Sequence, residues 1–432
     1  MCGRQEKKME NPISVQKPER LWTKDYIIVM LASFGTAFCN YIFFTALPLY
    51  AQKVSGSEFY SGLMLTVYSF AALLARPFSG IFSDKFGRVR LLIIGAFICA
   101  VACALYGITT AIILLLAIRV INGFGFGMHS TCAGAVAADV IPKSRMSEGI
   151  GYFGLYATFA AAFAPFIALT VVGKGEIRDF QQLFFIAAAL CLASMIFDCC
   201  ITYERKRKKA LRETALQGGQ SKTAAGPAAE EAAAKPAAPL PKTFLGFEYA
   251  VFQPMAVLIL LFFAQSSINT FLTLFAEARA LGNIGLYFTI NAVGLFASRV
   301  LFGRLTDRLG PDIVVIPGII GIVVCLAAIP FVHTPLLLYI IAAPMGLASG
   351  AVYPAINSMI FLRCSPQRRG TASAAYFAAI DIGFMIGGLV FGAVADTLGY
   401  SVVYWAAAVL TALALGLYLK AVAVKKPARA NI

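Results

Sequence analysis

The chain carries one motif twice, as ARPFSGIFSDKFGRVR over residues 75–90 and as SRVLFGRLTDRLGP over residues 298–311. Both copies follow the pattern Arg-x3-Gly-x3-Asp-x2-Gly, and Arg76 falls on Arg299 at an offset of 223 residues. Each copy lies where one long apolar stretch ends and the next begins. A polar motif repeated in this way indicates that the chain consists of two related halves.

Two further segments support the duplication. The offset of 223 residues carries Gly123 onto Gly346 and Gly127 onto Gly350. One residue later in register, Pro142 and Arg145 fall on Pro366 and Arg369, and Tyr152 and Phe153 fall on Tyr376 and Phe377. Chance matches would scatter over many offsets. With six helices in each repeat, both halves have the same orientation, and transporters of this symmetry place their substrate near the midplane between the halves.

The composition is that of a membrane protein, with 59% hydrophobic residues, 13% charged residues and a mean hydropathy of +0.79. A soluble chain is nearer to half apolar and a quarter charged. Apolar stretches long enough to cross a bilayer must be helical here, because lipid offers the backbone no hydrogen-bond partners. They lie near 26–50, 59–82, 90–110, 112–137, 148–172, 181–202, 251–276, 283–303, 313–332, 336–361, 370–395 and 401–421. The sequence therefore predicts an all-α membrane protein with twelve transmembrane helices in two pseudo-symmetric six-helix bundles.

The net charge of +15 follows the predicted topology. Most of the 36 Lys and Arg residues lie in the two tails and in every second loop, whereas the other loops hold only Lys53, Lys174, Arg178 and Arg279. The positive-inside rule then places both termini in the cytoplasm. We expect a multi-pass protein of the plasma membrane (the inner membrane in a bacterium), with its basic residues against anionic lipid rather than nucleic acid.

Five regions follow: a cytoplasmic tail over 1–25, a six-helix bundle over 26–202, a linker over 203–247, a second bundle over 248–421 and a cytoplasmic tail over 422–432. The linker opens on a basic run and continues in Ala/Pro/Gly-rich low complexity, which predicts a flexible segment. The polar N-terminus has no signal-peptide core, so the first helix is expected to remain as an anchor. The ten cysteines lack metal-ligand spacing and are expected to be buried free thiols; neither a metal nor a cofactor is predicted.

The motif over residues 80–90 resembles the signature cytoplasmic loop of the major facilitator superfamily, and the second copy repeats it. With the twelve helices, the two halves and the central linker, this resemblance covers essentially the whole chain. It implies a transporter without enzymatic activity, in which Asp84 latches the cytoplasmic side of the outward-facing state against the helix that begins near Gly370. Alternatively, these residues only fix topology and loop shape. The expected gate comprises Arg76, Gly80, Asp84, Arg88, Arg145, Glu148, Arg299 and Asp307.

The fourth predicted helix contains Arg119-Val-Ile-Asn-Gly123-Phe-Gly125, which resembles the Arg-bearing motif of proton-coupled exporters in this family. An arginine inside a span costs about 2.5 kcal/mol or more, so it must face a cavity or a partner. At about 100° per residue, one narrow face holds Arg119, Asn122, Phe126 and His129. This face is expected to line a central cavity. The alternative is an interhelical hydrogen-bond clamp, with His129 serving in packing rather than as a proton carrier.

Asp381 is the one acidic residue among the 21 that lies at the middle of a predicted span. Its counterpart in the first half is Ala157, just as Ala342 is the counterpart of Arg119. Features shared by both halves form the scaffold, so features of one half are better candidates for chemistry. A carboxyl group in a low-dielectric span can exchange a proton near neutral pH. Asp381 is therefore a candidate for proton coupling, with Arg119 and His129, or for the counter-ion of a cationic substrate. The alternative is a structural pair with an arginine or a backbone carbonyl group.

Helices one, four, seven and ten line the cavity in this family, and the resemblance implies that their polar and aromatic residues contact the solute. These candidates are Asn40, Asn122, Phe126, Gln265, Asn269, Tyr353 and Asn357. The segment 141–154 looks more like efflux members than sugar-uptake members. No nucleotide-binding P-loop motif occurs, so an ion gradient must supply the energy.

The first hypothesis is proton-coupled efflux of a small organic compound, either a drug-like amphiphile (multidrug resistance) or a metabolite such as a metal chelator. The expected partners are this substrate, protons and membrane lipids, and the expected unit is a monomer. The alternatives are uptake of a small anionic metabolite by proton symport, with Arg119 holding the anion, and a transport-inactive receptor or lipid flippase on the same scaffold.

Overall fold

The computed structural model of the chain describes residues 20–142, 145–173, 175–205, 243–244, 247–364 and 369–425. The predicted tails over 1–25 and 422–432 and the predicted linker over 203–247 therefore lie largely outside the described residues. The same holds for the side chains of three predicted gate residues, Asp84, Glu148 and Asp307.

The first half is entirely helical within the described residues. Its helices are α1 (Lys24–Ser55), α2 (Glu58–Phe86), α3 (Arg88–Tyr106), α4 (Ile112–Val140), α5 (Met146–Phe153), α6 (Leu155–Val172) and α7 (Ile177–Cys199). Glycines in positive-φ conformations end α1 at Gly56 and separate α2 from α3 at Gly87, where an L side chain would be strained. The sharp turn of the repeated motif is therefore a glycine turn.

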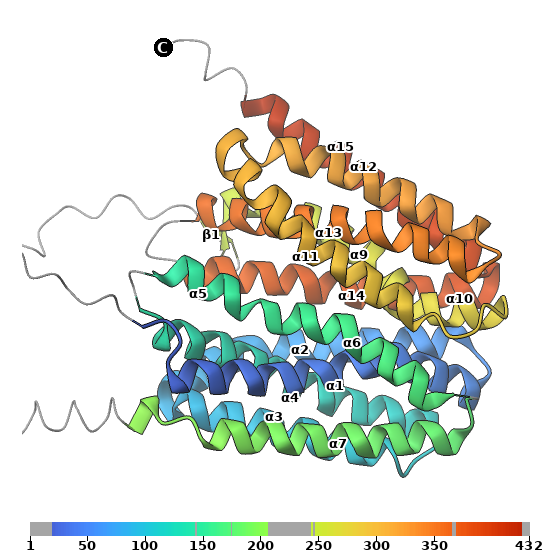
Figure 1. The fold of residues 1–432 in the computed structure, drawn as a ribbon, viewed down its shortest axis with the longest axis horizontal. Coiled ribbons are helices and arrows are strands. Elements are labelled where there is room, and N and C mark those ends of the chain that lie inside the picture. Colours follow the sequence, from blue (N-terminus) through green and yellow to red (C-terminus); the bar gives the residue numbers. More distant parts are fainter. Residues whose placement is uncertain are drawn as a thin grey trace, which may run out of the picture.

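The second half begins with a two-residue hairpin, β1 (Thr243–Phe244) antiparallel to β2 (Phe247–Glu248). The segments that follow are α9 (Tyr249–Ser266), the π-helical turn η4 (Ser267–Phe271), α10 (Leu272–Ala278), α11 (Gly285–Leu309), α12 (Asp312–Ala328), the 3-10 turn η5 (Ile329–Phe331), α13 (Pro335–Arg363), α14 (Arg369–Leu398) and α15 (Tyr400–Lys425). Because α5 and α6 form one rod, as do α9, η4 and α10, the two halves contribute six rods each (Figure 1). The predicted twelve-helix membrane fold is confirmed.

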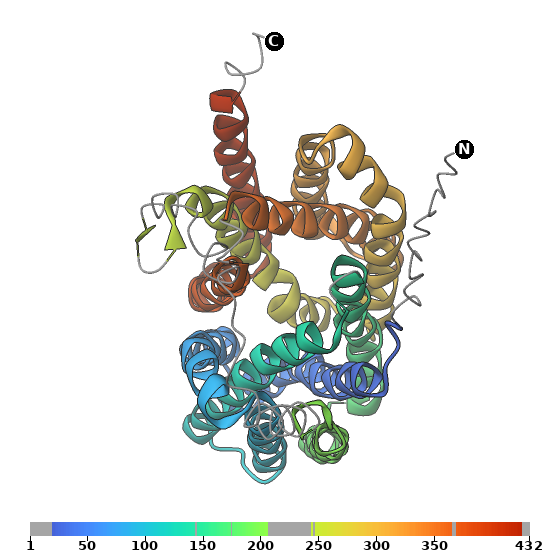
Figure 2. The ribbon, with the colours of Figure 1, turned by 90° about the vertical axis from the view of Figure 1, so that its left-hand side faces the viewer.

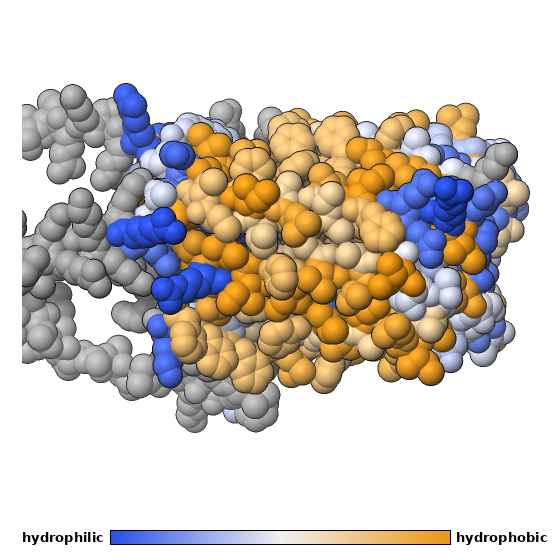
Figure 3. Space-filling model, turned by 90° about the horizontal axis from the view of Figure 1, so that it is seen from below, coloured by the Kyte–Doolittle hydropathy of each residue, from blue (hydrophilic) through white to orange (hydrophobic). Residues whose placement is uncertain are grey.

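Eleven of the helices in the described chain are long and apolar enough to cross a membrane by length and composition alone. The remaining rod, α11, is less apolar because it carries Asn291, Ser298 and Arg299 along its length and further charges toward its end. Figure 3 shows a broad apolar band across one face of the molecule, with hydrophilic residues at both ends. Such a band suits the hydrocarbon core of a bilayer, and the chain is a multi-pass membrane protein.

The duplication extends to the way in which the helices pack. A Cβ at Gly123 of α4 would overlap the Tyr68 backbone of α2, and a Cβ at Gly346 of α13 would overlap the Asn291 backbone of α11. Tyr68 and Asn291 are themselves related by the repeat offset of 223 residues. Small residues allow two helix backbones to approach closely in lipid, where apolar burial does not drive helices together. The glycine pair of each half therefore fixes the same helix contact.

The two halves lie on opposite sides of the molecule when it is viewed along the rods (Figure 2). They meet where α2 packs against α14 and where α6 packs against α11. We name the end of the molecule that carries the start of α1 and the end of α15 the near end, and the opposite end, with the turns at Gly56 and Gly399, the far end.

Hydrogen bonds join the two halves at the far end. Ser57 Oγ donates to Asp396 Oδ1 at 2.7 Å, and the Tyr400 hydroxyl donates to Glu58 Oε1 at 2.9 Å. Deeper in the membrane region, Thr289 Oγ1 donates to the Ala162 carbonyl oxygen at 2.9 Å. Among the described side chains, hydrogen bonds join the two halves at the far end and along the rods as far as their middle. The last of them is the pair Arg76–Asp381. The conformation is therefore closed at the far end.

Candidate functional site

Arg76 of α2 and Asp381 of α14 form an ion pair between the two halves. Arg76 Nε lies 2.5 Å from Asp381 Oδ2, and Nη2 donates to Oδ1 at 3.2 Å. Both side chains are mostly buried, with 11% and 6% of their surfaces exposed. Arg76 also donates from Nη1 to Ser130 Oγ at 3.3 Å, and its guanidinium lies 4.5 Å from the ring centre of Phe377. The sequence marked both residues but assigned them to different roles, and only the packing of the halves makes them partners.

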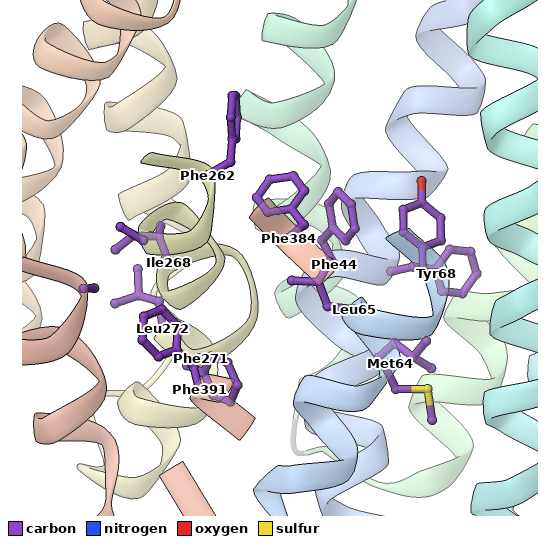
Figure 4. Close-up of a cluster of buried hydrophobic side chains, with 14 of the residues drawn as sticks. Phe44, Met64, Leu65, Tyr68, Phe262, Ile268, Phe271, Leu272, Phe384 and Phe391 are labelled. Atoms are coloured by element: carbon purple, nitrogen blue, oxygen red, sulfur yellow. The ribbon is translucent and has the colours of Figure 1, made fainter. Parts of the chain in front are cut away.

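Aromatic rings from both halves come together at the interface, where Figure 4 shows Phe44 and Tyr68 of the first half and Phe262 and Phe384 of the second. The Phe44 ring lies 5.5 Å from Tyr68 within the first half and 6.2 Å from Phe384 of the second half. Phe384 in turn lies 5.4 Å from Phe262, which stacks on Tyr353 at 4.8 Å. These contacts form a continuous aromatic layer across the interface.

Arg119 is buried within the first half, with 1% of its surface exposed. Its Nε donates to the Met64 carbonyl oxygen of α2 at 3.3 Å, and Nη1 donates to Asn122 Oδ1 at 3.0 Å. The guanidinium lies 4.1 Å from the ring centre of Tyr68. In this conformation Arg119 and Asn122 therefore form the interhelical clamp that the sequence left as the alternative, and they do not line a cavity. A coupling role for Arg119 stays a prediction.

His129 also lies inside the first half, with Nε2 3.2 Å from Asp198 Oδ2 of α7 and 3.4 Å from Thr36 Oγ1 of α1. His129 and Asp198 are 1% and 0% exposed, so they too are sealed from any cavity here. Phe126, on the same predicted face, is only partly buried and lies 6.0 Å from Tyr68. Asp198 was not predicted from the sequence, although an acidic residue inside an apolar stretch was the available signal.

Polar candidates of the second half form one chain of contacts. The Tyr353 hydroxyl donates to Gln265 Oε1 at 3.0 Å, and Gln265 Nε2 donates to Asn269 Oδ1 at 3.4 Å. Asn269 lies in the π-helical turn η4, a type of irregularity that is frequent at functional sites. Asn40 and Asn357 each have a buried side-chain oxygen without a hydrogen-bond partner among the described residues. Most buried polar atoms have a hydrogen-bond partner, so these two oxygens are exceptions that mark both residues for further test.

Three tyrosines from both halves lie close together in the middle of the protein: Tyr41 of α1, Tyr156 of α6 and Tyr376 of α14. Tyr41 is near enough to Tyr156 and to Tyr376 for their phenol groups to interact electrostatically. All three are partly exposed although they lie between the halves. We call the space that the exposed surfaces of these three phenols border the central space.

Arg299 of α11, the repeat counterpart of Arg76, is partly exposed and lies within electrostatic range of Tyr41 and Tyr376. Its Nε is buried without a hydrogen-bond partner among the described residues. The sequence placed Arg299 in the cytoplasmic gate with Arg76. Arg76 instead pairs with Asp381 of α14, and a gate role for Arg299 stays a prediction.

The predicted gate is described only in part. Arg88 Nη1 lies 2.8 Å from Asp139 Oδ2 and donates to the Ala135 carbonyl oxygen at 3.2 Å. Glu204 Oε1 accepts from the Arg88 backbone amide at 2.5 Å and so caps α3. These two acidic partners were missed from the sequence. Gly80 has open space at its Cβ position, so it is not needed there for close helix approach in this conformation.

The latch between Asp84 and the start of α14 stays a prediction, because the Asp84 side chain lies outside the described ones. Arg145 takes part in an interaction, while the side chain of Glu148 is not among those described. Within the described residues, no three His, Cys, Asp or Glu side chains are grouped so that they could hold a metal ion. None of the nine described cysteines forms a disulfide, and seven of them are buried.

Comparisons with known proteins agree with this architecture. The family model of the Major Facilitator Superfamily matches residues 29–283 and 256–431. The Multidrug resistance protein MdtG of Citrobacter koseri is 24% identical over 399 residues, which cover 89% of this chain and 91% of that protein. MdtG of Yersinia enterocolitica is 25% identical over 401 residues, covering 90% and 91%.

Solved structures share the fold at lower identity. The nucleoside transporter NupG is 15% identical with a TM-score of 0.66, covering 92% of this chain and 99% of that one. A POT family transporter in complex with 5-aminolevulinic acid is 13% identical with a TM-score of 0.70, covering 91% and 95%. The twelve helices, the repeated motif and the match over almost the whole chain lead to one conclusion: this chain belongs to the Major Facilitator Superfamily and is a membrane transporter of small molecules, not an enzyme.

Proposed function

We propose that the chain is a proton-coupled exporter of small organic amphiphiles that works by alternating access. The observation that carries this proposal is the buried ion pair between Arg76 and Asp381, which joins the two halves where their hydrogen bonds end. The MdtG relatives, which are named multidrug resistance proteins, support efflux.

The central space suits a partly apolar solute. Its lining includes the aromatic layer around Phe44 and Phe384 and the phenols of Tyr41 and Tyr376. Binding sites for small molecules are mostly apolar and aromatic, with a few polar groups that orient the ligand. Gln265 and Asn269 supply amide groups beside this layer. The apolar body of an amphiphile would pack on the rings, and its polar group would reach the amides or phenols.

The ion pair supplies a proton-sensitive contact between the halves. While Asp381 is ionised, it holds α14 against α2 through two hydrogen bonds to Arg76. A proton on the carboxylate removes the charge that holds the guanidinium, so the contact weakens and the two bundles can tilt to the other conformation. With both termini in the cytoplasm of a plasma-membrane protein, the conformation closed at the far end is the inward-facing one. The His129–Asp198 pair, inside one half, is less suited to this role.

A second candidate is uptake of a small anion by proton symport. The observation in its favour is the buried Nε of Arg299, which has no hydrogen-bond partner among the described residues and lies near Tyr41 and Tyr376. A cation there attracts an anionic solute, and a proton on Asp381 would make the same space more positive. Proton and anion would then bind together, which is the linkage that symport needs.

Transport into proteoliposomes with an imposed pH gradient of either sign separates the two directions. The purified chain is reconstituted, and a panel of aromatic amphiphiles of negative, zero and positive charge is supplied. Exporter coupling predicts net substrate movement against the proton flow, which reverses when the gradient reverses. Net movement in the direction of the protons would favour symport and reject efflux. Movement that ignores the gradient would remove proton coupling altogether.

A further inference from the structure

The two arginines of the repeated motif have different surroundings. Arg76 has a carboxylate, a hydroxyl and an aromatic ring as partners, in Asp381, Ser130 and Phe377. Arg299 has a buried Nε without a partner, and its guanidinium has no hydrogen-bonded acceptor among the described residues. A buried donor atom without an acceptor is unfavourable, whereas the Arg299 side chain as a whole is partly exposed and its charge can be reached by a solute.

The repeat explains why the acceptor is missing. Arg76 on α2 meets Asp381 on α14, and the equivalent contact of the other pair of helices is between α11 and α6. Thr289 of α11 bonds to Ala162 of α6, so these helices are in contact as the repeat requires. The position on α6 that corresponds to Asp381 is Ala157, which is partly exposed. The chain therefore has the cation of the second pair but leaves the place of its anion open.

Two phenol groups lie near Arg299. Tyr41 and Tyr376 both lie within electrostatic range of Arg299 and are partly exposed. Neither hydroxyl has a hydrogen-bond partner among the described residues. Phenols donate hydrogen bonds to anions, and their rings pack against planar apolar groups. The guanidinium supplies a planar, bidentate donor set that matches a carboxylate.

We propose that Arg299, Tyr41 and Tyr376 bind the anionic group of the transported molecule, an organic acid with an aromatic or aliphatic body. The carboxylate of this molecule takes the place at Arg299 that Asp381 takes at Arg76. That the bound molecule is a transported substrate rests on the proposed function. It names what the central site recognises and holds for either direction of transport.

Equilibrium binding tests the proposal without any gradient. The full chain in phosphatidylcholine nanodiscs is dialysed against radiolabelled 2-naphthoate and, separately, against the uncharged 2-naphthamide. We expect naphthoate to bind more tightly than naphthamide, and Arg299→Gln to weaken naphthoate binding by about tenfold or more, as for the loss of a charge-assisted hydrogen bond. Naphthamide binding should change little. Equal binding of naphthoate to the wild type and to Arg299→Gln would overturn the proposal.

A second variant keeps the test informative if Arg299→Gln does not fold. Ala157→Asp places a carboxylate where the repeat predicts the partner of Arg299, so it should fold and compete with the ligand. We expect naphthoate binding to fall by about tenfold, as in Arg299→Gln. Arg178→Gln removes an exposed arginine at the far end and is the matched control with unchanged binding. Undiminished naphthoate binding by Ala157→Asp would contradict the proposal.

Two further arms separate other sources of the effect. Nanodiscs that contain phosphatidylglycerol should give the same naphthoate affinity; competition by that lipid would assign the site to a lipid phosphate and reject an organic acid. Asp381→Asn should still bind naphthoate in an Arg299-dependent manner. The two experiments are independent. Proton coupling can be rejected by the gradient experiment while anion binding at Arg299 is retained, and anion binding can be rejected while proton coupling is retained.

Discussion

Arg76 and Asp381 are 305 residues apart in the chain, yet Nε of the first lies 2.5 Å from Oδ2 of the second. The pair crosses from α2 of one half to α14 of the other, and it is the innermost of the hydrogen bonds between described side chains of the two halves. Because this contact joins the two halves, the protonation state of Asp381 can change how strongly the halves are held together.

Replacing Asp381 with Asn is expected to abolish gradient-driven transport while retaining substrate exchange. The amide cannot take up a proton, and it leaves Arg76 without its counter-charge, which costs about 3–5 kcal/mol when a buried pair is broken. Transport in proteoliposomes, with and without a pH gradient, measures both activities. Asp198→Asn is the matched control: it alters a buried carboxylate that pairs with His129 inside one half, and coupling should survive. Full coupling in Asp381→Asn would remove this residue from the mechanism.

Arg119→Gln is expected to lower stability without altering substrate preference. The change leaves the Met64 carbonyl oxygen and Asn122 without their buried donor, at a cost of about 1–3 kcal/mol. Thermal unfolding of the detergent-solubilised protein gives the stability, and competition among several transported dyes gives the preference. Arg90→Gln, at an exposed position of α3, should change neither quantity. A shifted order of substrate preference at normal stability would instead return Arg119 to the substrate site.

Gly346→Ala is expected to disrupt the contact between α13 and α11. The added methyl group would overlap the backbone of Asn291, which cannot move away like a flexible side chain. Overpacking of this kind lowers the free energy of unfolding by about 1–3 kcal/mol or more. Yield and thermal stability of the purified protein report the effect. Gly416→Ala in α15 meets no atom within 4 Å and should be neutral or stabilising by up to about 1 kcal/mol. Equal tolerance at both positions would contradict the packing described here.

Asp396→Ala is expected to favour opening at the far end. It removes the acceptor of the Ser57 hydroxyl and of the Glu58 amide, at 2.7 Å and 3.1 Å, which joins α2 to α14. A loss of about 1 kcal/mol changes the ratio of the two conformations roughly fivefold. Distances between spin labels on the far-end turns of the two halves report the populations. Asp179→Ala is the control, because Asp179 caps α7 within one half, and its distance distribution should match that of the wild type.

The sequence by itself determined the twelve helices, their place in a membrane and the relation between the halves. These features are decided locally, because each apolar span must satisfy its own backbone in lipid and can do so only as a helix. The repeat offset even identified Gly123 and Gly346, whose equivalent packing roles the structure confirms. Helical periodicity also placed Arg119, Asn122 and His129 on one face of α4.

Only the tertiary structure decided what those faces meet. Periodicity gives the direction of a side chain around its own helix but not the neighbour that lies there, which depends on how twelve rods pack. Thus Arg119 clamps α4 to α2 instead of lining a cavity, and Asp381 takes Arg76 as its partner. Arg299 shares its motif with Arg76 but meets no carboxylate among the described side chains, and the facing helix has Ala157 at the place that corresponds to Asp381. The physical reason is that an ion pair needs two side chains brought together by packing. The sequence around one of them does not identify the other.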